Sequence, residues 1–264
     1  MTPRKAPVWG LLWALLGALY FFVPLYGTLD FSLRMIKGQL SPLAYQIVLS
    51  DPDFLAAFAF SARMALLTIL VSIVLFVPTT YWIHLRLPRL RPVIELVTLL
   101  PFIIPPIVLV FGLIRTFGRP PFSLTSTEFT TDILLVAGYV ILAMPYMYRA
   151  IDVGLRAIDI HTLTEASLSL GSSWFDVIVR VIVPNLRVAI LSGALITFAT
   201  VMGELILADF LVRPALGPYM VLIGEGHIYE PAALGIISFA ITWGAMGLIQ
   251  FFARGDIAQR LTIR

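Results

Sequence analysis

The sequence contains no cysteine among its 264 residues. This absence excludes disulfide bonds, zinc sites built on cysteine, and catalysis by a thiol nucleophile. It does not indicate a compartment, because membrane proteins without cysteine are common.

Charged residues are scarce as well. They make up 12% of the chain, whereas hydrophobic residues make up 59%, and the mean hydropathy is +0.96. An average soluble domain has about 25% charged residues. A chain of this composition has too few polar groups to cover its apolar surface in water, so the composition predicts a membrane protein.

Signals for nucleotide and nucleic-acid binding are also missing. No segment matches the G-x-x-x-x-G-K-[ST] pattern that holds nucleotide phosphates, so ATP could drive this chain only through another subunit. The net charge of +3 does not indicate nucleic acid, because the basic residues lie between apolar runs. With three scattered histidines and no cysteine, we expect no enzyme, no metal site and no cofactor.

Long apolar runs dominate the rest of the sequence. A helix needs about 20 apolar residues to cross the hydrocarbon core of a bilayer. Six segments qualify, at about residues 8–29, 58–83, 93–114, 133–149, 188–212 and 232–253. The sequence therefore predicts an all-α membrane protein with six transmembrane helices, organised as a single domain over residues 1–264. The first segment is longer than the apolar core of a signal peptide, so we expect a retained span.

The distribution of basic residues predicts the orientation. With the amino terminus inside, twelve Lys and Arg residues fall on inner segments and six on outer segments. The inner residues are Arg4, Lys5, Arg86, Arg89, Arg91, Arg149, Arg156, Arg180, Arg187, Arg254, Arg260 and Arg264. Because basic residues accumulate on the cytoplasmic side, both termini are predicted to be cytoplasmic.

The longest stretch between spans runs over about residues 150–187 and is predicted to be cytoplasmic; its central part is the segment at about residues 155–186. Its first half predicts a short helix, capped by Thr162 or Thr164, with Glu165 near the positive end of the helix dipole. Gly171 predicts the end of this helix, because glycine adopts the left-handed C-terminal conformation without steric cost.

A second short helix is predicted directly afterwards. Ser173 is a capping residue, and Asp176 three positions later completes a capping-box pattern. An apolar face is expected from Trp174, Phe175, Ile178 and Val181. Pro184 ends this helix or begins the next span. The segment should therefore form two short helices, joined at Gly171, along the inner membrane surface.

The same segment contains a spaced motif: Glu165-Ala166-Ser167, then Gly171, then Val181, Val183 and Pro184. This spacing resembles the EAA motif of ABC importer permeases, the inner-membrane components of binding-protein-dependent transport. The departures are Ser for the second Ala and Val for the usual Ile and Leu, all similar in size. The resemblance covers the whole chain and is nearest to the polyamine (spermidine/putrescine)-type permeases, which the stretch 203–212 supports less specifically.

The resemblance implies a type I ABC importer permease fold in the bacterial inner membrane. In that family the loop is a coupling helix that docks on a cytoplasmic ATPase, which assigns ATPase-coupling roles to Glu165, Ala166, Ser167, Leu170 and Gly171. Expected partners are a second, related permease, two ATPase subunits, a periplasmic or lipid-anchored solute-binding protein and membrane lipid. On the alternative interpretation, Glu165 is only a helix-start charge and Gly171 only a helix C-cap.

Two carboxylates fall within the predicted fifth span, Glu204 and Asp209. A carboxylate at membrane depth is costly unless it is hydrated or paired, so both residues are candidates for the translocation pathway of a small organic cation such as a polyamine. The alternative is an internal ion pair, for example between Glu204 and Arg63 or Arg115. On one continuous helix the two carboxylates would lie about 140° apart.

Other functions remain open from the sequence. An importer of iron(III), phosphonate, opine or sugar would belong to the same superfamily, and a proton-coupled secondary transporter would also have kinked spans and buried carboxylates. The prolines of Pro101-Phe-Ile-Ile-Pro105-Pro106 predict a distorted span. This distortion either serves packing or bends during gating.

Overall fold

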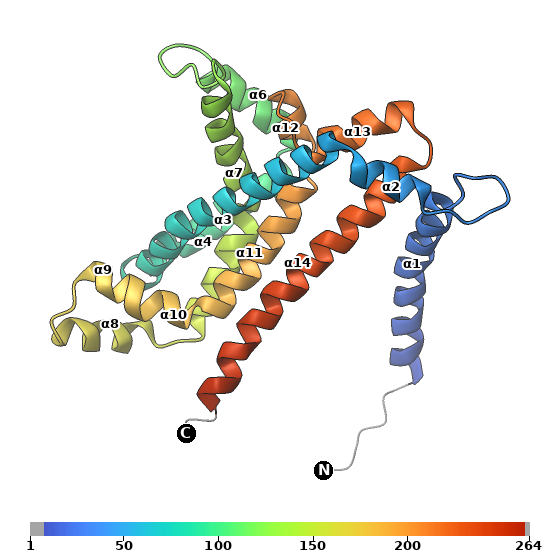
Figure 1. Ribbon diagram of the computed structural model, residues 1–264. Helices are drawn as coiled ribbons and strands as arrows, with labels where there is room; N and C mark the ends of the chain where they lie inside the picture. The colour runs from blue at the N-terminus through green and yellow to red at the C-terminus, as the bar shows by residue number, and fades with distance from the viewer. Residues whose placement is uncertain (1–7, 262–264) are drawn as a thin grey trace. The chain divides into compact units, whose positions relative to one another are not determined.

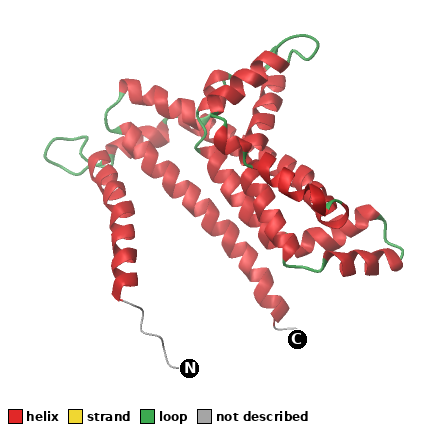
Figure 2. Cartoon of the chain, turned by 180° about the vertical axis from the view of Figure 1, so that it is seen from behind, coloured by secondary structure: helices red, strands yellow, loops and turns green. Residues whose placement is uncertain are grey.

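The computed structural model describes residues 8–261, and within this range every regular element is a helix (Figures 1 and 2). The elements are α1 (Val8–Ser32), α2 (Leu43–Ser50), α3 (Pro52–Arg86), η1 (Pro88–Leu90), α4 (Arg91–Thr98), α5 (Leu100–Ile103), α6 (Pro106–Phe117), α7 (Glu128–Arg156), α8 (Ile160–Ser169), α9 (Trp174–Asp176), the π-helix η2 (Val177–Ile182), α10 (Val183–Asn185), α11 (Arg187–Met202), α12 (Ile206–Phe210), α13 (Leu216–Gly226) and α14 (Glu230–Leu261). The basic residues Arg4, Lys5 and Arg264, on which the predicted orientation partly depends, lie outside the described residues.

The chain divides into two compact units, which are described separately. One unit comprises residues 1–55 and 220–243, and the other comprises residues 56–219 and 244–264. In the first unit, the Phe31 and Tyr229 rings lie 5.0 Å apart between centroids, so the end of α1 contacts the start of α14. The second unit contains the two predicted short helices and both membrane carboxylates, and the site is built within it.

Among the described residues, three helices are long and apolar enough to cross a membrane by themselves: α1, α3 and α7. With 35 residues, α3 is about 52 Å long, well beyond the hydrocarbon core. Two bent helix pairs raise the number of spans to as many as five. The sixth predicted span falls on α14, whose side chains from residue 248 onward lie outside the described part, so that span stays a prediction.

The predicted third and fifth spans are not continuous helices. The third breaks between Ile103 and Pro106 with a bend of 101°, and the fifth is interrupted at residues 203–205. A further bend, of 76°, lies at Leu186, before the predicted fifth span. Ile104 is extended, with φ −86° and ψ 117°, because a residue before proline is driven out of the helical region. The distortion expected from the proline-rich stretch is therefore a sharp break.

The helices α7 and α11 form the centre of the second unit and lie side by side in both views (Figures 1 and 2). Small residues allow this close approach. A Cβ at Gly154 would meet the Ala189 Cβ at 2.6 Å, and a Cβ at Gly193 would meet the Met147 sulfur at 2.8 Å. Glycine at these two positions lets the helix backbones pack more closely than larger residues would permit.

Candidate functional site

The first short helix of the predicted coupling segment is α8. Its N-cap is Asp159, whose carboxylate accepts hydrogen bonds from the Thr162 backbone N–H at 3.1 Å and the Thr162 hydroxyl at 2.7 Å. These two bonds hold the pKa of Asp159 below its ordinary value. The prediction that Thr162 or Thr164 caps the helix was wrong, because Thr164 lies inside the helix and is buried.

The helix α8 ends at Gly171 as the sequence predicts. Gly171 has φ +83°, its N–H donates to the Leu168 carbonyl at 2.9 Å, and the Ser172 N–H donates to the Ser167 carbonyl at 3.1 Å. These two bonds form a Schellman motif, which requires a left-handed residue at this position. A Cβ at Gly171 would meet no atom within 4 Å, so the backbone conformation alone favours glycine here.

The second helix starts at Ser173, also as predicted. The Ser173 hydroxyl donates to the Asp176 carboxylate at 2.7 Å and accepts from the Asp176 N–H at 3.2 Å. The bond from the Ser173 hydroxyl is the main cause that holds the pKa of Asp176 below its ordinary value.

The predicted apolar face of this helix needs correction. Val177 and Ile182 are fully buried, whereas Phe175 is 73% exposed. Residues 177–182 form a π-helix, whose wider turn changes which side chains share a face. The face was predicted with ordinary α-helical periodicity, and the π-helix shifts it.

A buried apolar cluster fastens both short helices to the long helices. Its members come from α3, α7, α8, η2 and the Leu186 junction: Val77, Tyr81, Met147, Ile151, Leu155, Ile160, Val177, Ile182 and Leu186. Within it the Tyr81 hydroxyl and the Thr164 hydroxyl are 2.8 Å apart and hydrogen-bonded. The helix α8 is therefore packed firmly against α3 and α7, because packed interiors deform little.

The residues predicted to contact an ATPase lie on the opposite side of α8. Glu165, Ala166 and Gly171 are exposed, and Leu170 is 87% exposed at the tip of the loop. Ser167 is half-buried and its hydroxyl donates to the Leu163 carbonyl at 2.8 Å. The structure thus places four of the five predicted coupling residues on an open surface.

Charged groups form a cluster that the sequence did not predict. The Asp152 carboxylate, fully buried, lies 2.8 Å from His84 Nε2, 2.9 Å from an Arg91 nitrogen and 2.6 Å from an Arg156 nitrogen. Arg156 also contacts Glu95 at 2.9 Å. This Asp152 cluster joins α3, α4 and α7. The available signal was a histidine and an aspartate at the ends of two predicted spans.

A second ionic cluster lies near the other end of α7. Asp132 accepts hydrogen bonds from Arg213 at 2.7 Å and from Arg63 at 3.1 Å, and both guanidinium groups lie 5.4 Å from the Phe60 ring centroid. The Ser61 hydroxyl also accepts a hydrogen bond from the Leu216 N–H at 2.8 Å. This Asp132 cluster joins α3 and α7 to the segment after α12.

The two ionic clusters are separated by the thickness of a bilayer core. Asp132 and Asp152 are 20 positions apart on α7, which corresponds to about 30 Å along the axis. Arg63 and Arg213, predicted outside, belong to one cluster, and Arg91 and Arg156, predicted inside, belong to the other. The clusters therefore divide the charged residues as the sequence-based topology expects.

Glu204 and Asp209 do not share one helix. Residues 203–205 interrupt the predicted fifth span between α11 and α12. The Glu204 carboxylate accepts hydrogen bonds from the Leu207 N–H at 2.9 Å and the Ala208 N–H at 3.3 Å. Asp209 is exposed. The predicted 140° separation on one helix was wrong because the helix ends first.

The alternative ion pair for Glu204 also differs from the structure. Arg63 contacts Asp132, and Glu204 is bonded to backbone N–H groups at the start of α12. Among the described residues, no group of three His, Cys, Asp or Glu side chains is arranged to hold a metal ion.

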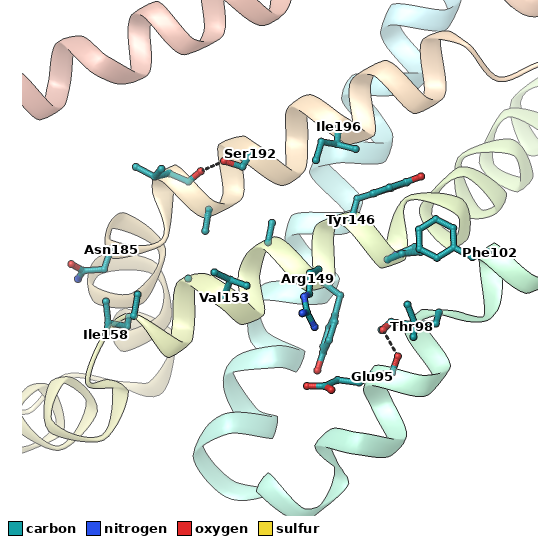
Figure 3. A pocket seen from close by; sticks show the side chains of 18 residues that line it. Glu95, Thr98, Phe102, Tyr146, Arg149, Val153, Ile158, Asn185, Ser192 and Ile196 are labelled. Atoms are coloured by element: carbon teal, nitrogen blue, oxygen red, sulfur yellow. Dashed lines mark hydrogen bonds between the residues drawn. The ribbon is translucent and has the colours of Figure 1, made fainter. Parts of the chain in front are cut away.

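Two cavities lie between α4–α5, α7 and α11. The larger has a volume of about 920 Å³, and its lining includes Glu95, Thr98 and Phe102 on one side, Tyr146, Arg149 and Val153 from α7, and Ser192 and Ile196 from α11 (Figure 3). The smaller has a volume of about 340 Å³ and is lined by Glu204, Thr200, Leu142 and Pro101 among others. Glu204 is thus the predicted pathway residue that faces a cavity.

Comparisons with known proteins agree with this architecture. Residues 77–262 match the family described as "Binding-protein-dependent transport system inner membrane component". Over 188 residues the chain is 30% identical to a probable molybdenum ABC transporter permease protein of Haloferax volcanii, covering 70% of this chain and 66% of the relative. It is 32% identical over 164 residues to the molybdenum transport permease ModB of Azotobacter vinelandii, covering 59% and 71%.

A polyamine relative and solved structures were found as well. The spermidine/putrescine permease PotB of Escherichia coli is 26% identical over 202 residues, covering 72% of this chain and 68% of the relative. A chain of a bacterial ABC transporter that imports alginate matches with a TM-score of 0.69 at 14% identity, covering 92% and 93%. A chain of the MetNI methionine transporter matches with a TM-score of 0.53 at 20% identity, covering 80% and 96%.

The solved structures establish the fold, an all-helical ABC importer permease fold, as predicted. The relatives are transport permeases rather than enzymes. With 186 of its 264 residues matched (77–262), this chain belongs to the family of binding-protein-dependent transport system inner-membrane components, the permeases of ABC importers.

Proposed function

We propose that the segment 155–186 of this permease docks on a cytoplasmic ATPase and transmits the closure of an ATPase dimer to the membrane helices. One observation carries the proposal: α8 is held to α3 and α7 by the buried cluster and the Tyr81–Thr164 hydrogen bond, while its other side is open. On that open side, Glu165, Ala166 and Leu170 are available to a partner surface. Gly171 sets the angle at which the second helix returns.

The proposed cycle is alternating access. A solute-binding protein delivers the solute, ATP-driven closure draws the coupling segments of two permeases together, and the membrane helices open to the outside. Hydrolysis then resets the helices. The chain has no nucleotide-binding pattern of its own, so the energy comes from the ATPase subunits.

The partners and the orientation follow from the same mechanism. We propose a second, related permease, two ATPase subunits and a solute-binding protein, and the binding-protein-dependent family supports this assembly. We also propose that both termini are cytoplasmic in a bacterial inner membrane. The Asp152 cluster lies near the end of α7 that leads into α8, and its arginines are among those predicted inside, which supports this orientation.

For the solute we propose a small organic cation such as a polyamine. Glu204 supplies a carboxylate to the smaller cavity, and the described residues that line this cavity include no Lys or Arg. The Phe102 and Tyr146 rings offer faces that attract cations. The relative PotB is a spermidine/putrescine permease.

An oxyanion is the second candidate solute. Two relatives are molybdenum permeases and a third is a probable sulfate permease from Prototheca wickerhamii. Arg149 lines the larger cavity and provides positive charge there. Uptake of radiolabelled putrescine and of molybdate by cells that express the whole transporter separates the two candidates, because each predicts transport of one probe only.

The coupling proposal is tested with Gly171→Trp. A bulky side chain at this exposed turn should block docking and abolish ATP-dependent uptake, while membrane insertion stays normal. Gly38→Trp is the matched control, since Gly38 also has a positive φ, +80°, and open space around its Cα. Normal uptake by the Gly171 variant would contradict the coupling role.

The pathway role of Glu204 is tested with Glu204→Gln. The amide oxygen still accepts a backbone N–H from α12, so the helix start is kept while the negative charge is removed. For a cationic solute we expect a raised KM with normal protein levels. Unchanged kinetics would remove Glu204 from the pathway, and Asp209→Asn serves as the comparison because Asp209 belongs to the lining of neither cavity.

A further inference from the structure

The two cavities share two lining residues. Phe102 and Tyr146 belong both to the lining of the 920 Å³ cavity and to that of the 340 Å³ cavity that contains Glu204. The rings contact one another edge to face, with centroids 5.5 Å apart and planes at 79°. Figure 3 shows both aromatic side chains at the end of the larger cavity toward Ile196. The aromatic pair therefore stands at the boundary between the cavities.

Phe102 lies next to a sharp break in the backbone. It belongs to the four-residue helix α5, which follows α4 through the helical residue Leu99 and ends at the extended residue Ile104, before the bend of 101°. The Phe102 and Ile104 N–H groups donate to the Leu99 and Leu100 carbonyls, whereas Pro105 has no N–H to continue the helix. The side chain is 58% exposed, and packing restrains it little. Phe102 is therefore the less tightly packed of the two rings, since Tyr146 is half-buried.

Tyr146, in contrast, belongs to a fixed helix. The long helix α7 is attached to α3 by the Asp132 cluster near one end and the Asp152 cluster near the other. The same Asp152 cluster also holds α4 through Arg91, and α4 leads directly into α5. Because α4 is tied to α7, a movement of the Phe102 ring relative to Tyr146 would arise in α5, next to the break at Ile104.

We propose that Phe102 and Tyr146 form a gate between the Glu204 cavity and the larger cavity, and that displacement of the Phe102 ring joins the two into one path. This inference rests on the proposed function, because it assumes that the solute passes through these cavities. In the present conformation the two rings, in edge-to-face contact, lie between the linings of the two cavities. The break at Ile104 provides the hinge for the displacement.

The first experiment measures passive leak through the assembled transporter. Phe102→Ala removes one ring of the pair, so proteoliposomes loaded with radiolabelled putrescine or with molybdate should lose the transported probe without ATP about tenfold faster than wild type. Ile103→Ala is the matched control, since Ile103 lies on the same short helix, is 70% exposed and lines neither cavity. A wild-type leak rate for both probes in the Phe102 variant would overturn the gate.

The second experiment exploits the absence of cysteine from this chain. Phe102→Cys introduces a single thiol, whose reaction with a membrane-impermeant maleimide is timed in the nucleotide-free and the vanadate-trapped transporter. If the ring position moves during the cycle, the labelling rate should differ about tenfold between the two states. The rate at Phe129→Cys should stay constant, since Phe129 is 73% exposed and lies on the fixed helix α7. Equal rates in both states at Phe102→Cys would overturn the proposal. This readout needs no knowledge of the solute.

The two proposals fail in different ways. If Gly171→Trp abolishes uptake while both Phe102 variants behave like wild type, the gate is wrong and the coupling role stands. If Phe102→Cys labelling follows the nucleotide state while Gly171→Trp transports normally, the gate stands and the coupling segment has been misassigned.

Discussion

Neutralising Asp152 tests how strongly the Asp152 cluster holds α3, α4 and α7 together. We expect Asp152→Asn to destabilise the protein even though the side chain keeps its shape. The buried carboxylate accepts hydrogen bonds from Arg91 and Arg156 and contacts His84 Nε2 at 2.8 Å. An asparagine would turn an NH2 group toward at least one of these donors, and that contact would be lost.

The expected loss follows from these contacts. A hydrogen bond to a charged group contributes about 1.5–3 kcal/mol, and removal of one partner from a buried ion pair costs about 3–5 kcal/mol. The loss is reduced here because the Arg91 and Arg156 side chains are 27% and 46% exposed and both still contact Glu95. We therefore expect the free energy of unfolding to fall by about 2–4 kcal/mol.

The assay is thermal unfolding of the purified variant in lipid nanodiscs. In a domain of this size each kcal/mol shifts Tm by about 2–4 °C, so the Asp152 variant should unfold about 5–15 °C below wild type. Glu225→Gln is the control, since Glu225 is exposed and its neutralisation should change stability by less than about 0.5 kcal/mol. A Tm within about 2 °C of wild type would show that the cluster contributes little to stability.

Three further predictions concern the contacts around the coupling segment and the other ionic cluster. Tyr81→Phe should lower the free energy of unfolding by only about 1 kcal/mol, because the Thr164 hydroxyl loses one partner but keeps its bond to the Ile160 carbonyl. An uptake defect in this stably folded variant would show that the lost bond transmits movement. Arg213→Gln should destabilise the protein by about 1–3 kcal/mol and Arg63→Gln by less, because the Arg213 side chain is 10% exposed and the Arg63 side chain 60%. Equal Tm values for the two variants would contradict this ranking. Because the folded-state pKa of Asp159 lies below the ordinary 3.8, its cap contributes fully above pH 3.8 and is lost as the pH falls through the folded-state value. The Tm of the Asp159→Asn variant should therefore fall less than the Tm of wild type when the pH is lowered from neutral to 3.8 or below. Identical pH profiles of Tm would contradict the capping role of Asp159.

The features of the coupling segment that the sequence predicted depend on residues close together in the chain. Gly171 ends α8 and Ser173 starts the next helix through hydrogen bonds that span five residues or fewer. The incorrectly predicted N-cap of α8 shows where predictions from nearby residues fail. Thr164 is a good capping residue, but its hydroxyl bonds to Tyr81, 83 positions away.

The membrane spans show the same difference between features that depend on nearby residues and features that depend on distant ones. Apolar runs were sufficient to find α1, α3 and α7, because a long hydrophobic helix satisfies its own backbone in lipid. The break at Ile104 had a visible cause in the flanking prolines, and the distortion was expected there. The break at residues 203–205 was missed, since it depends on how Glu204 bonds to the start of α12.

The sequence by itself determined that this chain is a membrane protein, that basic residues gather in two groups at opposite ends of α7, and that the segment 155–186 forms two short helices joined at Gly171. Composition is a property of the whole chain, and local hydrogen bonds join residues only a few positions apart. Both can therefore be predicted from the sequence. Only the tertiary structure decided that Asp152 and Asp132 tie α7 to α3 at two levels, and that Phe102 meets Tyr146 between two cavities. These contacts join residues 44 to 69 positions apart, and their partners are selected by the packing of whole helices.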